Sequence, residues 1–180
     1  MKKLVVISIL MLPLVSFAQA GLDGTWNNTT SETEKNEKQK AESEITMSAD
    51  YTFKGDTYSI VMHCLVNFTS LEKEASLNIK VTGSHSGTLK REGDRLTLIP
   101  DKKKKPEVEV TSSADGLKGG NLVKTLLSVP LKREVSNAMK IPESYRIVSL
   151  TDTELVLEDI LDPIETKRGE TPEIETFTRQ

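Results

Sequence analysis

Apolar residues that recur at every second position across residues 45–53 and 58–68 are the feature that most constrains this fold. From Ile45 to Phe53 every odd position is apolar, and the even positions between them are polar. After a turn at Gly55-Asp56, the even positions from Tyr58 to Phe68 form a second apolar set. Successive side chains of a β-strand point to opposite faces, so the pattern predicts two strands that each bury one face.

Shorter runs of the same kind continue along the chain. They cover residues 75–81, 88–91, 96–98, 108–110, 145–150, 155–157 and 174–178. A Gly-Ser-His-Ser-Gly segment at 83–87 is expected to form a turn or a bulge. Many strands joined by short turns are typical of an antiparallel meander or barrel. We therefore expect an all-β fold with a small helical insert, built as an antiparallel up-and-down β-barrel of about eight strands.

One stretch has helical spacing instead. Leu131, Val135, Ala138 and Met139 fall at positions i, i+4, i+7 and i+8, which predicts an amphipathic helix. Pro130 suits the first turn of such a helix, with Ser128 as its cap and residues 122–127 as a shorter preceding helical turn. The insert is thus expected near residues 117–141.

Two polar stretches, residues 31–44 and 162–172, carry mixed charges and almost no apolar residue. Their composition predicts loops, and neither stretch reads as a linker between domains. Residues 21–180 are accordingly expected to form a single domain, whose length suffices for a sizeable core.

The N-terminal segment predicts export. Lys2 and Lys3 precede an apolar run at residues 4–15, and Ala18-Gln19-Ala20 has the small-x-small pattern of a cleavage site. The run is too short to cross a bilayer as a helix, and we expect no membrane span elsewhere. Residues 1–20 are therefore predicted to be a cleavable signal peptide. Because the only cysteine is Cys64, no lipid anchor is expected at the cleavage point, and the expected location is periplasmic or secreted.

The charge of the chain excludes some partners. The net charge is −3, and removal of Lys2 and Lys3 would make it −5. A mildly acidic protein is poorly suited to nucleic acid or to anionic membranes. Cys64 cannot form an intramolecular disulfide, and its place in the apolar alternation predicts that it is buried.

The two ends of the expected domain carry a family resemblance. Gly24-Thr25-Trp26 near the first strand and Thr178-Arg179 in the last strand resemble the lipocalin pattern, in which the arginine stacks on the tryptophan and closes the barrel. Segments 147–157 and 175–179 resemble the C-terminal half of exported lipocalin-like domains of Gram-negative bacteria. The resemblance implies a calycin-like barrel closed by Gly24, Trp26 and Arg179. The helical insert before the last three strands departs from the lipocalin pattern.

The inward faces of the expected strands supply the candidate ligand-lining residues. These are Tyr51, Phe53, Tyr58, Ile60, Met62, Leu77 and Ile79. They either surround a pocket for a small apolar ligand, which a barrel of about eight strands can hold, or fill the core. Aromatic residues make up only 4% of the chain, and their scarcity favours core filling.

No catalytic or metal-binding set stands out. His63 and Cys64 are adjacent in a strand and point to opposite faces, so they cannot bind one metal ion together. The segment around His85 lacks the serine and the strand-turn-helix context of a nucleophile elbow. We therefore expect no enzyme activity, no metal and no cofactor.

These observations support three hypotheses. The first is an exported, non-enzymatic binding module, with a small hydrophobic ligand as its expected partner. The second is an interaction or inhibitor module that contacts a cell-envelope protein, motivated by the helical insert and by Val61 and Leu65 on the second face of their strand. The third, and least supported, is a hydrolase that uses loop carboxylates.

Overall fold

Long antiparallel strands dominate the chain. The computed structural model describes residues 21–36, 40–70, 72, 75–116, 120–161 and 163–180; the signal-peptide prediction lies outside them. The elements are β1 (Gly24–Asn36), β2 (Ala41–Lys54), β3 (Thr57–Ser70), β4 (Ala75–Glu92), β5 (Arg95–Pro100), β6 (Glu107–Asp115), α1 (Gly120–Ala138), β7 (Glu143–Leu150), β8 (Glu154–Asp159), α2 (Pro163–Arg168) and β9 (Ile174–Arg179).

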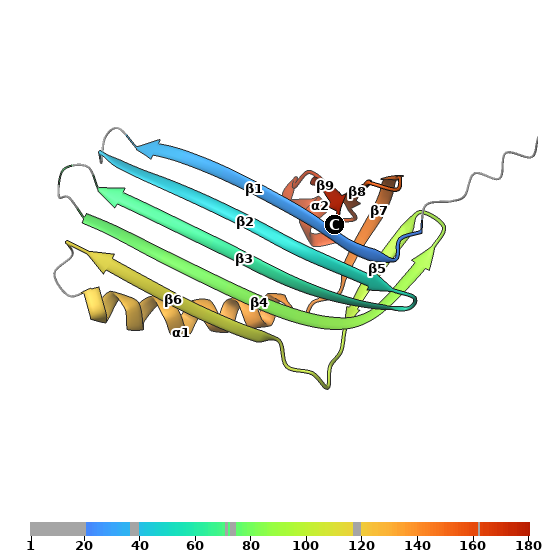
Figure 1. Ribbon diagram of the computed structural model, residues 1–180, viewed down its shortest axis with the longest axis horizontal. Coiled ribbons are helices and arrows are strands. Elements are labelled where there is room, and N and C mark those ends of the chain that lie inside the picture. Colours follow the sequence, from blue (N-terminus) through green and yellow to red (C-terminus); the bar gives the residue numbers. More distant parts are fainter. Residues whose placement is uncertain (1–20, 37–39, 71, 73–74, 117–119, 162) are drawn as a thin grey trace, which may run out of the picture.

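Eight of these strands close into a barrel (Figure 1). Each pairs antiparallel with its neighbours in the order β3-β2-β1-β9-β8-β7-β5-β4, and β3 returns to β4. Strand β6 is a ninth strand that pairs with β4 beside β5. The all-β prediction of an antiparallel barrel of about eight strands with a helical insert is therefore confirmed.

Strand β4 changes its partner midway, which divides the barrel into two ends. Its first half pairs with β6 as far as Ser84, and its second half pairs with β5 from Gly87 onward. The predicted turn or bulge at 83–87 is wrong, because β4 continues through it with an unbroken register to β3. A Cβ atom on Gly87 would lie 2.0 Å from the Ile99 carbonyl oxygen. Glycine here permits the close backbone approach at which the strand switches partners.

A filled core occupies the end of the barrel where β5, β7, β8 and β9 complete the wall; we call it the closed end. Its fully buried side chains include Trp26, Phe53, Phe177, Ile60, Leu96, Leu98, Leu155 and Leu157. Leu22, Tyr51, Tyr58, Leu89 and Tyr145 complete this cluster. Aromatic and leucine side chains thus supply most of the buried volume.

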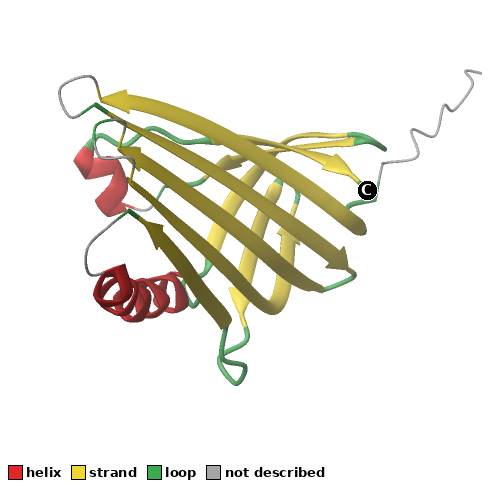
Figure 2. Cartoon of the chain, turned by 60° about the vertical axis from the view of Figure 1, so that its left-hand side comes forward, coloured by secondary structure: helices red, strands yellow, loops and turns green. Residues whose placement is uncertain are grey.

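The other end is wider and is covered by a helix; we call it the open end. Strands β1 to β4 and β6 extend past the closed end, and α1 packs against β6 (Figure 2). Between the sheet and α1 lies a second, smaller cluster made of Val81, Val108 and Met139, with Met62, Cys64, Ile79, Val110, Leu131 and Val135 packed on it.

The predicted loop at residues 31–44 is wrong, since most of this stretch is the hairpin of β1 and β2. Ser31 pairs with Thr46 in the ladder, and the Lys35 ammonium lies 3.5 Å from the Glu42 carboxylate. The hairpin extends beyond the core, so both of its faces are polar and the alternation that marks a half-buried strand is missing. The second predicted loop, 162–172, contains the short helix α2.

Helix α1 is longer than predicted. It runs without a break from Gly120 to Ala138, with Ser128 and Pro130 inside it rather than at its start. Proline removes one backbone hydrogen bond of a helix. The packing of Leu131 and Val135 on the second cluster offsets that loss. Among the described residues, no helix is long and apolar enough to cross a membrane.

Candidate functional site

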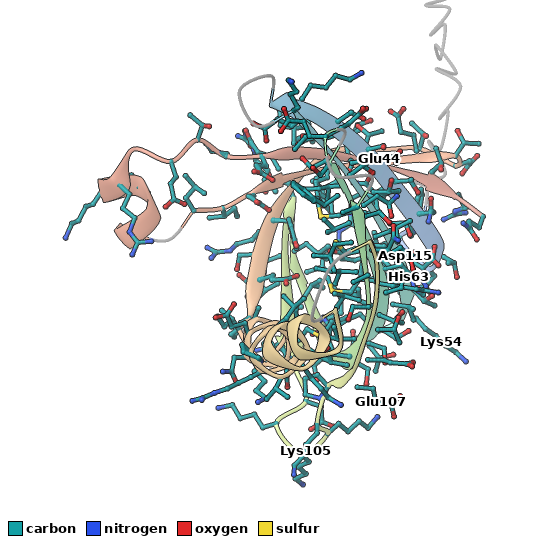
Figure 3. All side chains as sticks on the ribbon, turned by 90° about the vertical axis from the view of Figure 1, so that its left-hand side faces the viewer. Glu44, Lys54, His63, Lys105, Glu107 and Asp115 are labelled. Carbon is teal, nitrogen blue, oxygen red and sulfur yellow. The ribbon has the colours of Figure 1, made fainter. Side chains whose placement is uncertain are left out.

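A cavity of about 650 Å³ lies at the open end, between the inner face of the long strands and α1. Figure 3 looks along the barrel from this end and shows α1 facing the sheet across the interior. The volume falls within the range of about 300–1,000 Å³ that is usual for small-molecule sites. Met47, on the wall, is 51% exposed, so the cavity is accessible to solvent.

The cavity wall is mostly aliphatic and comes from four elements. Strands β2, β3 and β4 contribute Met47, Ala49, Met62, Cys64, Val66, Ile79 and Val81, and α1 contributes Leu131 and Val135. The strand residues among them share the inward-facing parity of their strands. Methionine side chains are flexible and polarisable, so this wall can adapt to ligands of different shape.

A group of acidic and phenolic side chains lies where the cavity meets the closed end. Tyr51 and Glu175 line the cavity directly. Glu143 accepts a hydrogen bond of 2.9 Å from the Tyr145 hydroxyl, and Tyr145 shares a side-chain hydrogen bond with Tyr51. Glu143, Asp159 and Glu175 come from β7, β8 and β9, and each has the parity of the buried side chains in its strand.

Burial and mutual repulsion change the acidity of this group. Burial, together with the charges of Asp159, Glu143 and Glu173, raises the pKa of the Glu175 carboxyl to about 7. Burial likewise raises the pKa of Glu143, against the opposing effect of the Tyr145 hydrogen bond. The neighbouring carboxylates therefore act unfavourably on the ionised form of Glu175.

The structure divides the predicted ligand-lining residues between the two ends. Tyr51, Met62 and Ile79 line the cavity. Phe53, Tyr58 and Ile60 belong to the filled core. Leu77 is half-buried and does not border the cavity. Each of the two interpretations of the sequence, pocket lining and core filling, thus describes one part of the set.

The closure residues meet at the closed end. The guanidinium carbon of Arg179 lies 4.6 Å from the centre of the Trp26 ring, in the range of a cation–π contact. Arg179 also donates to the backbone carbonyl of Asp23 at 3.0 Å. Gly24 has a φ of 135°, and a Cβ atom there would lie 3.6 Å from Arg179. This contact joins the first and last strands of the barrel.

The histidines and the cysteine form no metal site with their neighbours. His63 is exposed, and His85 stacks edge-on against Tyr58 with ring centres 5.6 Å apart. Cys64 faces inward as predicted but is only half-buried, because it borders the cavity. In the part of the chain that the structure describes, no group of three metal-ligating side chains is found.

The sequence analysis missed the acidic group and the contribution of α1 to the wall. A signal for the acidic group was present in the strand parity. Glu175 lies on the same face of its strand as Phe177 and Arg179. Asp159 lies on the same face as Leu155 and Leu157. Carboxylates in phase with buried residues indicate side chains that point inward.

No protein-family model matches the chain, and no curated protein matches it either.

Proposed function

We propose that this protein is an exported, non-enzymatic binding module that holds a small apolar ligand in the cavity at the open end. The observation that carries the proposal is the aliphatic cavity of about 650 Å³ beside a core that is otherwise filled. A site of this kind, mostly apolar with a few convergent polar groups, is the usual form of a ligand pocket.

Two parts of the proposal come from the sequence. Export is inferred from the composition of residues 1–20. A lipocalin-like classification is supported by the Trp26–Arg179 contact and by the closed antiparallel barrel. The insertion of β6 and α1 before the last three strands remains its main departure from the lipocalin pattern.

Binding of the uncharged fluorescent probe N-phenyl-1-naphthylamine tests the proposal, with two variants of adjacent residues on β3. Met62 lines the cavity, whereas Val61 points to the outer face and is 37% exposed. Met62→Arg places a charge in the apolar wall and should weaken probe binding at least tenfold. Val61→Arg should leave the affinity within about twofold. Absence of saturable binding to the wild type, or equal effects of the two variants, would contradict the proposal.

A second candidate is contact with a cell-envelope protein through the outer face of β3. Val61 and Leu65 are both more than a third exposed there. Their cross-strand neighbours on β2 are Asp50 and Thr46, so the apolar area is interrupted. Gel filtration and an envelope pull-down with a Val61→Arg variant would test this candidate. A monomeric protein with no retained partner would contradict it.

A further inference from the structure

We propose that the cavity at the open end takes a cationic amphiphile, with its apolar chain along the methionine-containing wall and its protonated amine at Glu175. This inference rests on the proposed binding function and specifies the chemical class of the ligand. It is carried by the shape and charge of the cavity together.

The charge of the wall points to a cation. Two carboxylates, Glu134 from α1 and Glu175 from β9, line the cavity, and no lysine or arginine lines it among the described residues. Glu143 and Asp159 add negative charge behind Glu175. A ligand with a positive head is complementary to this potential, whereas an anionic head would be repelled by it.

Among the described residues, none pairs with the Glu175 carboxylate in a way that would compete with such a head. None of the ion pairs between described residues includes Glu175 or Glu143. Glu143 already accepts the Tyr145 hydroxyl, while the described residues donate no side-chain hydrogen bond to the Glu175 carboxylate. An ammonium group would supply both the donor and the opposite charge.

The rest of the cavity wall is mostly apolar and determines the chemistry of the second part of the ligand. Besides Glu175, the cavity is lined by Ala49, Met62 and Ile79, and by Met47, which is 51% exposed. An aliphatic chain gains free energy by leaving water along this surface. The cavity therefore suits a molecule with one charged end and one apolar end.

Displacement of N-phenyl-1-naphthylamine by decylamine, decanol and decanoate at pH 8 tests the inference. The three competitors have similar chains and differ in the head. At this pH the amine is protonated, and Glu175, with a pKa of about 7, is mostly ionised. We expect decylamine to bind about tenfold more tightly than decanol, and decanoate to bind most weakly.

Two variants test whether the preference for decylamine depends on Glu175. Glu175→Gln should reduce the ratio of decylamine affinity to decanol affinity, measured in the same variant, to within about threefold. Glu154→Gln is the matched control, because Glu154 is exposed at the first position of β8, whereas Asp159, which acts on Glu175, is at the last. This variant should keep the full preference for decylamine. If Glu175→Gln does not fold, which a thermal melt would show, Glu143→Gln takes its place and should lower the preference.

The outcomes separate this inference from the function on which it rests. If neither the probe nor decanol binds, the binding function itself is wrong. If decanol binds as tightly as decylamine, or decanoate binds more tightly, the binding function stands and the cationic ligand is overturned. Retention of the full preference by Glu175→Gln would also overturn it.

Discussion

The closed and open ends of this barrel share four strands but are filled differently. Strands β1, β2, β3 and β4 pass through both ends. At the closed end they meet aromatic and leucine side chains, and every aromatic residue in the described part of the chain except Phe68 lies in that core. At the open end methionine, valine and isoleucine face α1 across a cavity. The comparison shows that the packed core is concentrated at one end and the cavity at the other.

The largest expected effect comes from emptying the closed end. Trp26 is fully buried and its indole N–H donates to the Leu22 carbonyl at 2.8 Å. Trp26→Ala removes this side chain and the ring on which Arg179 stacks, and should lower the free energy of unfolding by about 3–5 kcal/mol. Urea denaturation measures the loss. An unfolding curve that matches the wild type would show that the closed end does not hold the barrel together.

Two neighbouring inward positions on β3 sharpen the comparison. Ile60 is 1% exposed in the closed-end core, whereas Met62 is half-buried at the cavity. Ile60→Ala should cost about 2–5 kcal/mol of unfolding free energy, and Met62→Ala about 1 kcal/mol. Urea denaturation of the two variants compares the ends directly. Equal losses would mean that the two ends are packed alike.

A smaller loss of stability is expected from a substitution at the point where β4 changes its partner from β6 to β5. Gly87→Ala would place its Cβ atom against the Ile99 backbone and should cost about 1–3 kcal/mol. At Gly83 the nearest atom is the terminal methyl of Met139, which can move. Gly83→Ala is therefore the control, with an expected loss below about 1 kcal/mol. Thermal melts of both variants test the prediction, and a larger loss at Gly83 would refute it.

The smallest expected effect is a dependence of stability on pH. The pKa of Glu175 is about 7 in the folded protein against a usual 4.5. Between these values the folded protein retains a proton that the unfolded chain releases, so stability should fall as the pH rises from about 5 to 8. Because the side chain is partly exposed, the expected fall is about 1–2 kcal/mol.

Glu143, Asp159 and Glu173 act electrostatically on Glu175, which in turn acts on Tyr51; Glu134 and His63 line the same cavity. Glu175→Gln should flatten the pH dependence measured by urea midpoints. A slope that persists in this variant would assign the titration to another group.

Much of the fold could be predicted because burial of one strand face leaves an alternation in the sequence. Strands β2 and β3 were found this way, since Tyr51 and Ile60 alternate with polar neighbours. The outer part of the β1–β2 hairpin was missed because nearly all of its residues are polar, so no apolar alternation marks it. The partner switch near Gly87 was missed because it depends on the approach of β5, which no local pattern encodes.

The candidate site was predictable only in part. Met62 and Ile79 were found from their strand parity. Ile60 lies on the same face of β3, two residues before Met62, yet it belongs to the filled core. Which of these inward positions border the cavity depends on where β5, β7, β8 and β9 stop completing the barrel. Glu175 was missed because a carboxylate on an inward position looks like an interruption of the apolar pattern rather than a part of a site.

The most direct test of the central claim is an NMR titration with decanol of protein carrying ¹³C-labelled methionine methyl groups. Met47 and Met62 line the cavity, and the indole N–H of Trp26 reports on the closed end. If the open end holds apolar ligands beside a filled core, the Met47 and Met62 resonances will shift with saturation and the Trp26 resonance will stay in place. Unchanged methionine resonances, or an equal shift of Trp26, would contradict the account.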